Sequence, residues 1–139
     1  MILYRLARKR YATDLSGIGA RKVGGRCNPP GTAAVYTAEH ISLAVLEALV
    51  HLDKQDIPED YVVMAIELGS DVQIRYADVM TAFSESMQAL YPVIAVPSVV
   101  VPRERNYVLY PEVRGLNVAV AWTESFRFDP RLFPLPSNK

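Results

Sequence analysis

The sequence has few of the residues that stabilise secreted and membrane proteins. Its single cysteine, Cys27, cannot form an internal disulfide, and no group of cysteine and histidine has the spacing of zinc ligands. The longest apolar stretches, residues 41–52 and 93–101, contain polar interruptions and fall short of the roughly 20 residues that a membrane helix needs. At the N-terminus a short apolar run precedes the charges, which is the reverse of a signal peptide. We therefore expect a cytoplasmic protein that does not span a membrane.

An excess of charge of either sign is also absent. Fifteen basic and fifteen acidic residues give a formal net charge of zero, so no global field draws the protein to nucleic acid or to an anionic membrane. Direct binding to nucleic acid is therefore not expected. The 139 residues fit one domain, residues 1–139, and a chain of this length buries about two thirds of its unfolded surface.

Short β-branched segments dominate the remaining pattern. Residues 40–52 are apolar on almost every face, which predicts a central helix, capped by Thr37 and buried on most sides. Residues 9–26 indicate a functional loop, 78–90 a helical or irregular segment, and the proline-rich residues 126–136 an extended cover. A turn at residues 69–71 predicts that the third and fourth strands form a hairpin. The predicted strands are residues 2–6, 33–36, 61–68, 72–76, 93–101, 107–109 and 116–122. The fold class is therefore α+β, with a mostly β core.

Glu47 is the most informative position, because it interrupts the apolar run of the central helix. Burying an unpaired carboxylate there would be costly. Two interpretations stay open from the residues alone. Either Glu47 lies on the one wet face of the helix, or it lines a cavity, where functional acids are found.

Other candidate positions have an equally plain structural explanation. Arg26 follows two glycines that permit close backbone approach, a setting suited to phosphate binding and equally to a solvated loop. Tyr36, at the end of its predicted strand, can stack on a ligand ring or cap the core. Turn chemistry explains Ser98 and Asn106 as well as ligand contact does. The place of Tyr4-Arg5 relative to any cleft is left open.

The two histidines and the cysteine are weaker candidates for functional residues. His40 and His51 are predicted to be solvated, with no third ligand at metal spacing, so no metal site is expected. Arg26 beside Cys27 would lower the pKa of the thiol, yet no histidine close in sequence indicates a catalytic cysteine.

Taken together, these positions resemble the RES-domain family, named for Arg, Glu and Ser residues that Arg26, Glu47 and Ser98 match. The supporting strings cover nearly the whole chain in order: GGRCNP (24–29), VYTAE (35–39), SLAVLEALVH (42–51), VPS (96–98), NYVL (106–109) and FRFDPRL (126–132). The chain departs from the family pattern at Cys27 (usually Trp) and at Tyr110-Pro111 (usually Asn-Pro). It is also shorter between Tyr76 and Val93, where the usual Gly-Asp-x-Trp element is missing.

The resemblance implies a fold similar to ADP-ribosyltransferases, with a split β core, one central buried helix and peripheral helices. It implies a toxin that depletes NAD⁺, as substrate and without a cofactor, by cleaving the nicotinamide–ribose bond with water or phosphate. Glu47 would face the ribose, Tyr36 would border the nicotinamide, and Arg26 would hold phosphate oxygens. Ser98 and Asn106 would add secondary polar contacts.

The same resemblance implies a partner. This would be an antitoxin with a helix-turn-helix domain that blocks the active site, and a homodimer within the complex is also allowed. Basic residues Arg21, Lys22 and Arg26 offer an anchor for a carboxylate of that antitoxin. Two alternative functions remain open, an ADP-ribosyltransferase that modifies a protein target and a binding module of reduced catalytic activity.

Overall fold

The computed structural model describes residues 1–78 and 90–133. The prediction of a helical or irregular segment at residues 78–90 falls almost wholly outside this range. So does the end of the predicted proline-rich cover.

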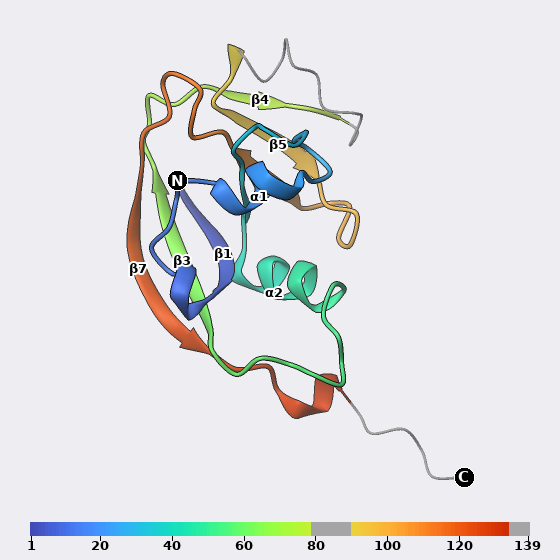
Figure 1. Ribbon diagram of the computed structural model, residues 1–139. Coiled ribbons are helices and arrows are strands. Elements are labelled where there is room, and N and C mark those ends of the chain that lie inside the picture. The colour runs from blue at the N-terminus through green and yellow to red at the C-terminus, as the bar shows by residue number, and fades with distance from the viewer. Residues whose placement is uncertain (79–89, 134–139) are drawn as a thin grey trace, which may run out of the picture.

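Seven strands form one mixed sheet, which confirms the α+β class (Figure 1). Their order across the sheet is β4-β5-β6-β2-β1-β3-β7, and every neighbouring pair is antiparallel except β4 and β5. The strands are β1 (Ile2–Arg8), β2 (Val35–Ala38), β3 (Tyr61–Leu68), β4 (Ile74–Tyr76), β5 (Val93–Pro97), β6 (Arg105–Leu109) and β7 (Val118–Phe126). The β-branched and apolar residues that favour a pleated, half-buried surface supply most of these segments.

The sheet is nearly divided in two between β1 and β2. These two strands pair at one register position only, Tyr4 with Ala38, whereas β1 pairs with β3 along its whole length. Figure 1 shows the consequence, with β3 and β7 on one side of the molecule and β4 and β5 on the other. The split β core expected from the resemblance is therefore present, and a gap in hydrogen bonding opens where β1 and β2 part.

One helix, α2 (Ile41–Leu49), packs against β1 and β2 at this division. Its Leu43 and Ala44 are buried with Ala38, while Leu46 and Val50 are exposed. The helix is central as predicted, but the prediction that it is buried on most sides is wrong. The sheet covers only one face of it, so its apolar sequence leaves an exposed apolar face on the other side.

Several helix and strand boundaries predicted from the local sequence differ from those of the structure. Thr37 does not cap α2, because it lies inside β2 and its hydroxyl donates to the Tyr107 carbonyl. His40 is the N-cap residue instead. Tyr36 is the second residue of β2 and not the end of that strand. The predicted loop at residues 9–26 contains a short helix, α1 (Ile18–Val23), and one 3₁₀ turn, η1 (Lys9–Tyr11).

The predicted hairpin between the third and fourth strands does not form. β4 pairs in parallel with β5, while β3 lies between β1 and β7. The turn at residues 69–71 therefore carries the chain across from one half of the sheet to the other. After β7, the short 3₁₀ helix η2 (Pro130–Leu132) and edge-to-face contacts of Phe128 with Tyr61 and Phe133 hold the described part of the C-terminal segment against the core.

None of the helices in residues 1–78 and 90–133 combines the length and the apolar character that crossing a bilayer requires.

Candidate functional site

The pleat of the sheet brings several polar side chains to one face. Tyr36 and Ala38 alternate with core residues along β2, and their register partners on β6 are Val108 and Asn106. Residues directly opposite each other share a face of the sheet. Asn106 and Tyr36 therefore lie on the same side, the side that α2 partly covers.

Glu47 points from α2 toward this face and is held there by two side chains. Its Oε1 accepts hydrogen bonds from the Ser98 hydroxyl at 2.6 Å and from Asn106 Nδ2 at 2.9 Å. Both bonds end on Oε1, and the structure gives Oε2 no hydrogen bond to any described residue. Glu47 also lines the two hollows described below, so the interpretation that it lines a cavity is confirmed. We call Glu47, Ser98 and Asn106 the Glu47 wall.

Ser98 is oriented by the turn that follows β5. Its oxygen accepts from the backbone N–H groups of Val100 and Val101, both at 3.0 Å. With both N–H groups donating to that oxygen, the serine proton is directed to Glu47. Ser98 is only 2% exposed, so this contact is shielded from water.

The opposite wall is the Arg26 loop, residues 24–32, and Asn28 organises it. Asn28 Nδ2 donates to the carbonyls of Ala20 at 2.8 Å and Thr32 at 2.9 Å, and its Oδ1 accepts from the Tyr36 hydroxyl. Asn28 is 2% exposed. One buried amide thus ties the end of α1, the loop that carries Arg26 and β2 together.

Tyr36 closes the same loop from β2. Its hydroxyl accepts from the Cys27 N–H at 3.0 Å while it donates to Asn28. A Cβ at Gly25 would stand 2.7 Å from the Tyr36 oxygen, so only glycine allows this approach. The hydroxyl is therefore used structurally, and the ring of Tyr36 is the part that lines the cleft.

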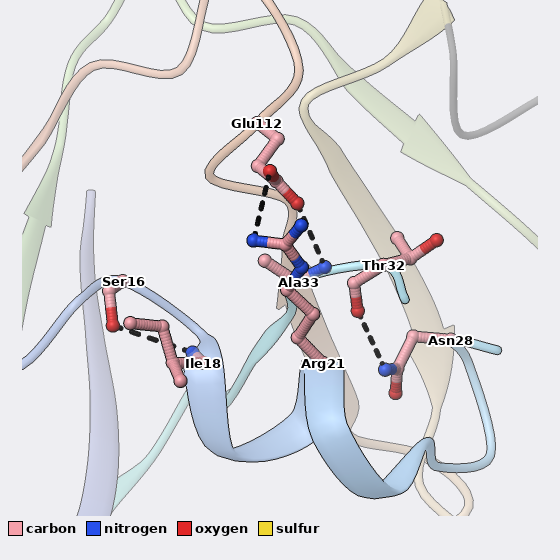
Figure 2. Close-up of polar contacts among 7 residues, drawn as sticks. All are labelled: Ser16, Ile18, Arg21, Asn28, Thr32, Ala33 and Glu112. Atoms are coloured by element: carbon pink, nitrogen blue, oxygen red, sulfur yellow. Dashed lines mark hydrogen bonds and ion pairs between the residues drawn. The ribbon is translucent and has the colours of Figure 1, made fainter. Parts of the chain in front are cut away.

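An ion pair holds the outer side of the loop. Figure 2 shows the Glu112 carboxylate between Arg21 and the backbone of Ala33. The Arg21–Glu112 distance is 3.6 Å, and Ala33 N donates to Glu112 Oε1 at 3.3 Å. Both side chains are about half exposed, so we expect the pair itself to stabilise the fold only slightly.

The two walls enclose a cleft made of two adjacent hollows. The Arg26 hollow has a volume of about 360 Å³ and the Arg5 hollow about 290 Å³, within the range of small-molecule sites. Arg26, Cys27, Val96 and Val108 line the first hollow only. Tyr4, Arg5, Leu6, Thr37, Ala38, Ala44 and Ala48 line the second only. Tyr36, Glu47, His51 and Asn106 line both.

The structure thus brings together all five residues predicted from the sequence. Arg26, Tyr36, Glu47 and Asn106 line the cleft, and Ser98 contacts it through Glu47. They come from the Arg26 loop, β2, α2, β6 and the turn after β5. Their roles toward a ligand remain predictions.

His51, predicted to be solvated, is exposed and also lines both hollows, and the place of Arg5 was left open. His51 lies two residues beyond the end of α2, so helical spacing from Glu47 does not account for its place at the cleft. Arg5 lies where β1 and β2 part, a place that no local pattern indicates. Burial lowers the pKa of Arg5, and its Nη1 donates to the Asp14 carbonyl at 3.3 Å.

Burial also changes the acidity of two groups in the cleft. It raises the pKa of Tyr36 to about 12, although the Cys27 N–H partly opposes the shift. Burial likewise raises the pKa of Cys27 and outweighs the effect of Arg26. Both groups stay protonated near neutral pH, which argues against a thiolate nucleophile at Cys27.

Tyr110, which follows β6, supports the Arg26 loop from the core. Cys27 and Tyr110 belong to one buried cluster, and the Tyr110 hydroxyl donates to the Cys27 carbonyl at 2.8 Å. A residue distant in sequence therefore helps to hold the backbone of this loop in place.

Comparison with known proteins gives one family and a consistent set of relatives. The family model of the RES domain matches residues 2–130. "Toxin Res" of Yersinia enterocolitica is 33% identical over 153 residues, covering 95% of this chain and 99% of that protein. "Prs ADP-ribosylating toxin" of Sphingobium sp. is 30% identical over 151 residues, covering 91% of both.

One solved structure has the same fold. A chain in the crystal structure of the M. tuberculosis MbcT–MbcA toxin–antitoxin complex superposes with a TM-score of 0.70 at 18% identity. The match covers 95% of this chain and 86% of the other.

Proposed function

This chain belongs to the RES-domain family, and on that premise we propose that it is the toxin of a toxin–antitoxin pair and consumes NAD⁺ as its substrate. The observation that carries the proposal is the Glu47 wall. It presents one carboxylate, held through Oε1 by Ser98 and Asn106, to a cleft that also contains Arg26 and Tyr36. A fixed carboxylate beside an aromatic ring and a guanidinium suits a dinucleotide with a cationic ring and phosphates.

The reaction breaks the bond between the nicotinamide nitrogen and the ribose C1. Nicotinamide leaves as a neutral ring that needs no proton, and positive charge develops on the ribose. A carboxylate stabilises such a charge, as in other glycosyl cleavages. Attack by water yields ADP-ribose and a proton, whereas attack by phosphate yields a phosphorylated ADP-ribose. Glu47 Oε2 would face the ribose, since Oε1 accepts the hydrogen bonds of Ser98 and Asn106.

Arg26 and Tyr36 would hold the substrate in place. The guanidinium of Arg26 pairs with phosphate oxygens in a bidentate manner, and the ring of Tyr36 borders the nicotinamide. Arg5, which lines the adjacent hollow together with Tyr36, would supply a second cation toward the same ligand. This division assigns binding to the Arg26 loop and the chemical step to the Glu47 wall.

The test is consumption of NAD⁺ by the purified chain, with and without phosphate, with products separated by mass. We expect Glu47→Gln to lower kcat by at least about 10²-fold, because the charge is lost while the shape is kept. Glu124→Gln, on the exposed face of β7, is the matched control and should leave the rate unchanged. Binding of NAD⁺ by wild type without turnover would overturn the enzymatic proposal and favour a binding module.

A second candidate function has one observation in its favour, the name of the Sphingobium relative as an ADP-ribosylating toxin. In that case a protein side chain replaces water or phosphate as the acceptor. An ADP-ribosylated protein band with labelled NAD⁺, together with little free ADP-ribose, would favour it. The same Glu47 variant would abolish either activity.

An antitoxin that covers the cleft is the second part of the proposal. A third hollow of about 440 Å³ adjoins the cleft and shares Arg5 and Tyr36 with it. It is lined by Lys22 and by the exposed apolar side chains of Tyr11, Ile18 and Val23. Support comes from the solved structure of similar fold, which is a toxin–antitoxin complex.

The chemistry of this hollow suits a segment with an apolar side chain and a carboxylate. Of the three basic residues of the proposed anchor, Lys22 lines this hollow, Arg26 lines the Arg26 hollow, and Arg21 pairs with Glu112. The helix-turn-helix type of the antitoxin follows from family resemblance alone. Full NAD⁺ consumption in a complex saturated with the antitoxin would contradict this part of the proposal.

A further inference from the structure

Three possible metal ligands meet at the start of α2, outside the cleft. Glu39 follows β2, His40 is the N-cap residue of α2, and Glu104 precedes β6. The ligand atoms of the three side chains all lie within 4.8 Å of one another. Because Glu104 is far from the other two in sequence, spacing alone indicates no such site.

Backbone contacts hold the three residues in this arrangement. Glu39 N donates to the Arg105 carbonyl at 3.3 Å, and Arg105 N donates back to Glu39 Oε1 at 2.8 Å. Glu104 N donates to the Val101 carbonyl at 2.9 Å, within the turn that carries Ser98. The pairing of β2 with β6 therefore brings Glu39 and Glu104 together, while the side-chain rotamers set the spacing of the ligand atoms.

The carboxylates of the cluster have no paired lysine or arginine in the described part of the chain. Glu104 Oε1 is buried and has no hydrogen-bond partner, a state that costs free energy. The nearby Arg105 guanidinium is turned away, toward the Ala77 carbonyl and the ring of Tyr76.

We propose that Glu39, His40 and Glu104 bind a divalent transition-metal ion of the zinc and manganese class. One imidazole and two carboxylates suit these ions, whereas Mg²⁺ and Ca²⁺ prefer oxygen alone and Cu⁺ prefers sulfur. Metal–ligand bonds of about 2.0 to 2.2 Å require the three ligand atoms to move closer together by small side-chain rotations. His40 is exposed, which gives it the freedom to do so and leaves room for water ligands.

The ion would link two segments that the active site depends on. Ser98 N donates to the Glu104 carbonyl at 2.8 Å, so the turn bearing Ser98 and the helix bearing Glu47 would both be tied to the metal. Binding of the ion itself does not rest on the proposed NAD⁺ chemistry, and failure of one proposal leaves the other standing.

The experiment is titration of the untagged full-length chain, first treated with a chelator, with Zn²⁺ and separately with Mn²⁺ by calorimetry. We expect one equivalent of metal to bind and the melting temperature to rise with metal concentration. His40→Ala and Glu104→Gln should each weaken metal binding by about 10-fold or more. Substituting a residue that only hydrogen-bonds a metal ligand already lowers affinity by about 10-fold, and removing the ligand itself should cost at least as much. Circular dichroism of the metal-free variants checks that they fold.

Two control variants separate this site from others. His51→Ala removes the other histidine, and Glu124→Gln removes an exposed carboxylate, so both should keep wild-type affinity. If Glu104→Gln fails to fold, Glu39→Gln takes its place. No saturable binding by wild type, or full affinity in either the His40 or the Glu104 variant, overturns the proposal.

Discussion

The two walls of the cleft are built in opposite ways. In the Arg26 loop, the amide of Asn28 reaches carbonyls only 4 and 8 residues away in sequence. In the Glu47 wall, Ser98 and Asn106 contact a glutamate 51 and 59 residues away. The first wall is organised mainly by local contacts, whereas the second exists only after the sheet has formed.

This contrast indicates a division of labour between the walls. The Arg26 loop is stabilised mainly by the hydrogen bonds of the Asn28 side chain. Substitutions there should therefore loosen the loop and weaken substrate binding. The Glu47 wall carries few stabilising contacts but holds the reactive carboxylate, so damage there should act on turnover. The following variants test this contrast, from the largest expected effect on stability to the smallest.

Asn28→Ala should lower the free energy of unfolding by about 3 kcal/mol. The change leaves the carbonyls of Ala20 and Thr32 and the Tyr36 hydroxyl without their buried partner. Urea denaturation measures the loss. Under the proposed function, KM for NAD⁺ should rise more than kcat falls, because Arg26 loses its orientation. Asn117→Ala, at an exposed position just before β7, serves as control. A loss below about 1 kcal/mol at Asn28 would show that the loop is held in another way.

Ser98→Ala should lower the free energy of unfolding less, by about 2 kcal/mol. It frees the N–H groups of Val100 and Val101 and removes one hydrogen bond from Glu47. Here kcat should fall about 10-fold with KM nearly constant, the reverse of the Asn28 variant. Ser98→Thr, which keeps the hydroxyl, should restore part of kcat. If Ser98→Ala changed KM alone, the proposal that the Glu47 wall acts on turnover and the Arg26 loop on binding would be wrong.

Tyr110→Phe should cost about 1 kcal/mol, since it removes the hydrogen bond to the Cys27 carbonyl but keeps the ring in the core. Thermal and urea unfolding both report this change. Combining it with Asn28→Ala should give less than the sum of the two losses, because both act on the same loop. Strict additivity would mean that Tyr110 supports the core rather than the loop.

Alkaline pH should weaken the fold without any substitution. Burial raises the pKa of Tyr36 and of Tyr107 to about 12, against an ordinary value of about 10 in the unfolded chain. Below pH 10 both states are protonated and the stability is intact. From about pH 10 to 12 the unfolded state releases its protons first, so the free energy of unfolding falls. Urea titrations across this range should show a shallower decline for Tyr36→Phe than for wild type.

Sequence patterns predicted much of the fold where one local rule decides the outcome. The third strand was placed at residues 61–68, where β3 lies, because a run of β-branched residues ends at Gly69. The central helix was located correctly, yet its burial was misjudged because apolar composition does not say which faces the sheet covers. The prediction of a hairpin between the third and fourth strands was wrong for a similar reason. The residues of a turn do not determine which strand the next strand pairs with, and β4 pairs with β5.

The sequence determined which residue types are present at the site. Several short strings that occur in the same order as in one family identified Arg26, Tyr36, Glu47, Ser98 and Asn106. The sequence also determined the Arg26 loop, because Asn28 and Gly25 satisfy local backbone geometry. Only the tertiary structure decided that Glu47 faces a cleft and that Arg5 lies beside it. Those placements depend on strand order and on the parting of β1 from β2, which arise from packing over the whole chain and not from any single segment.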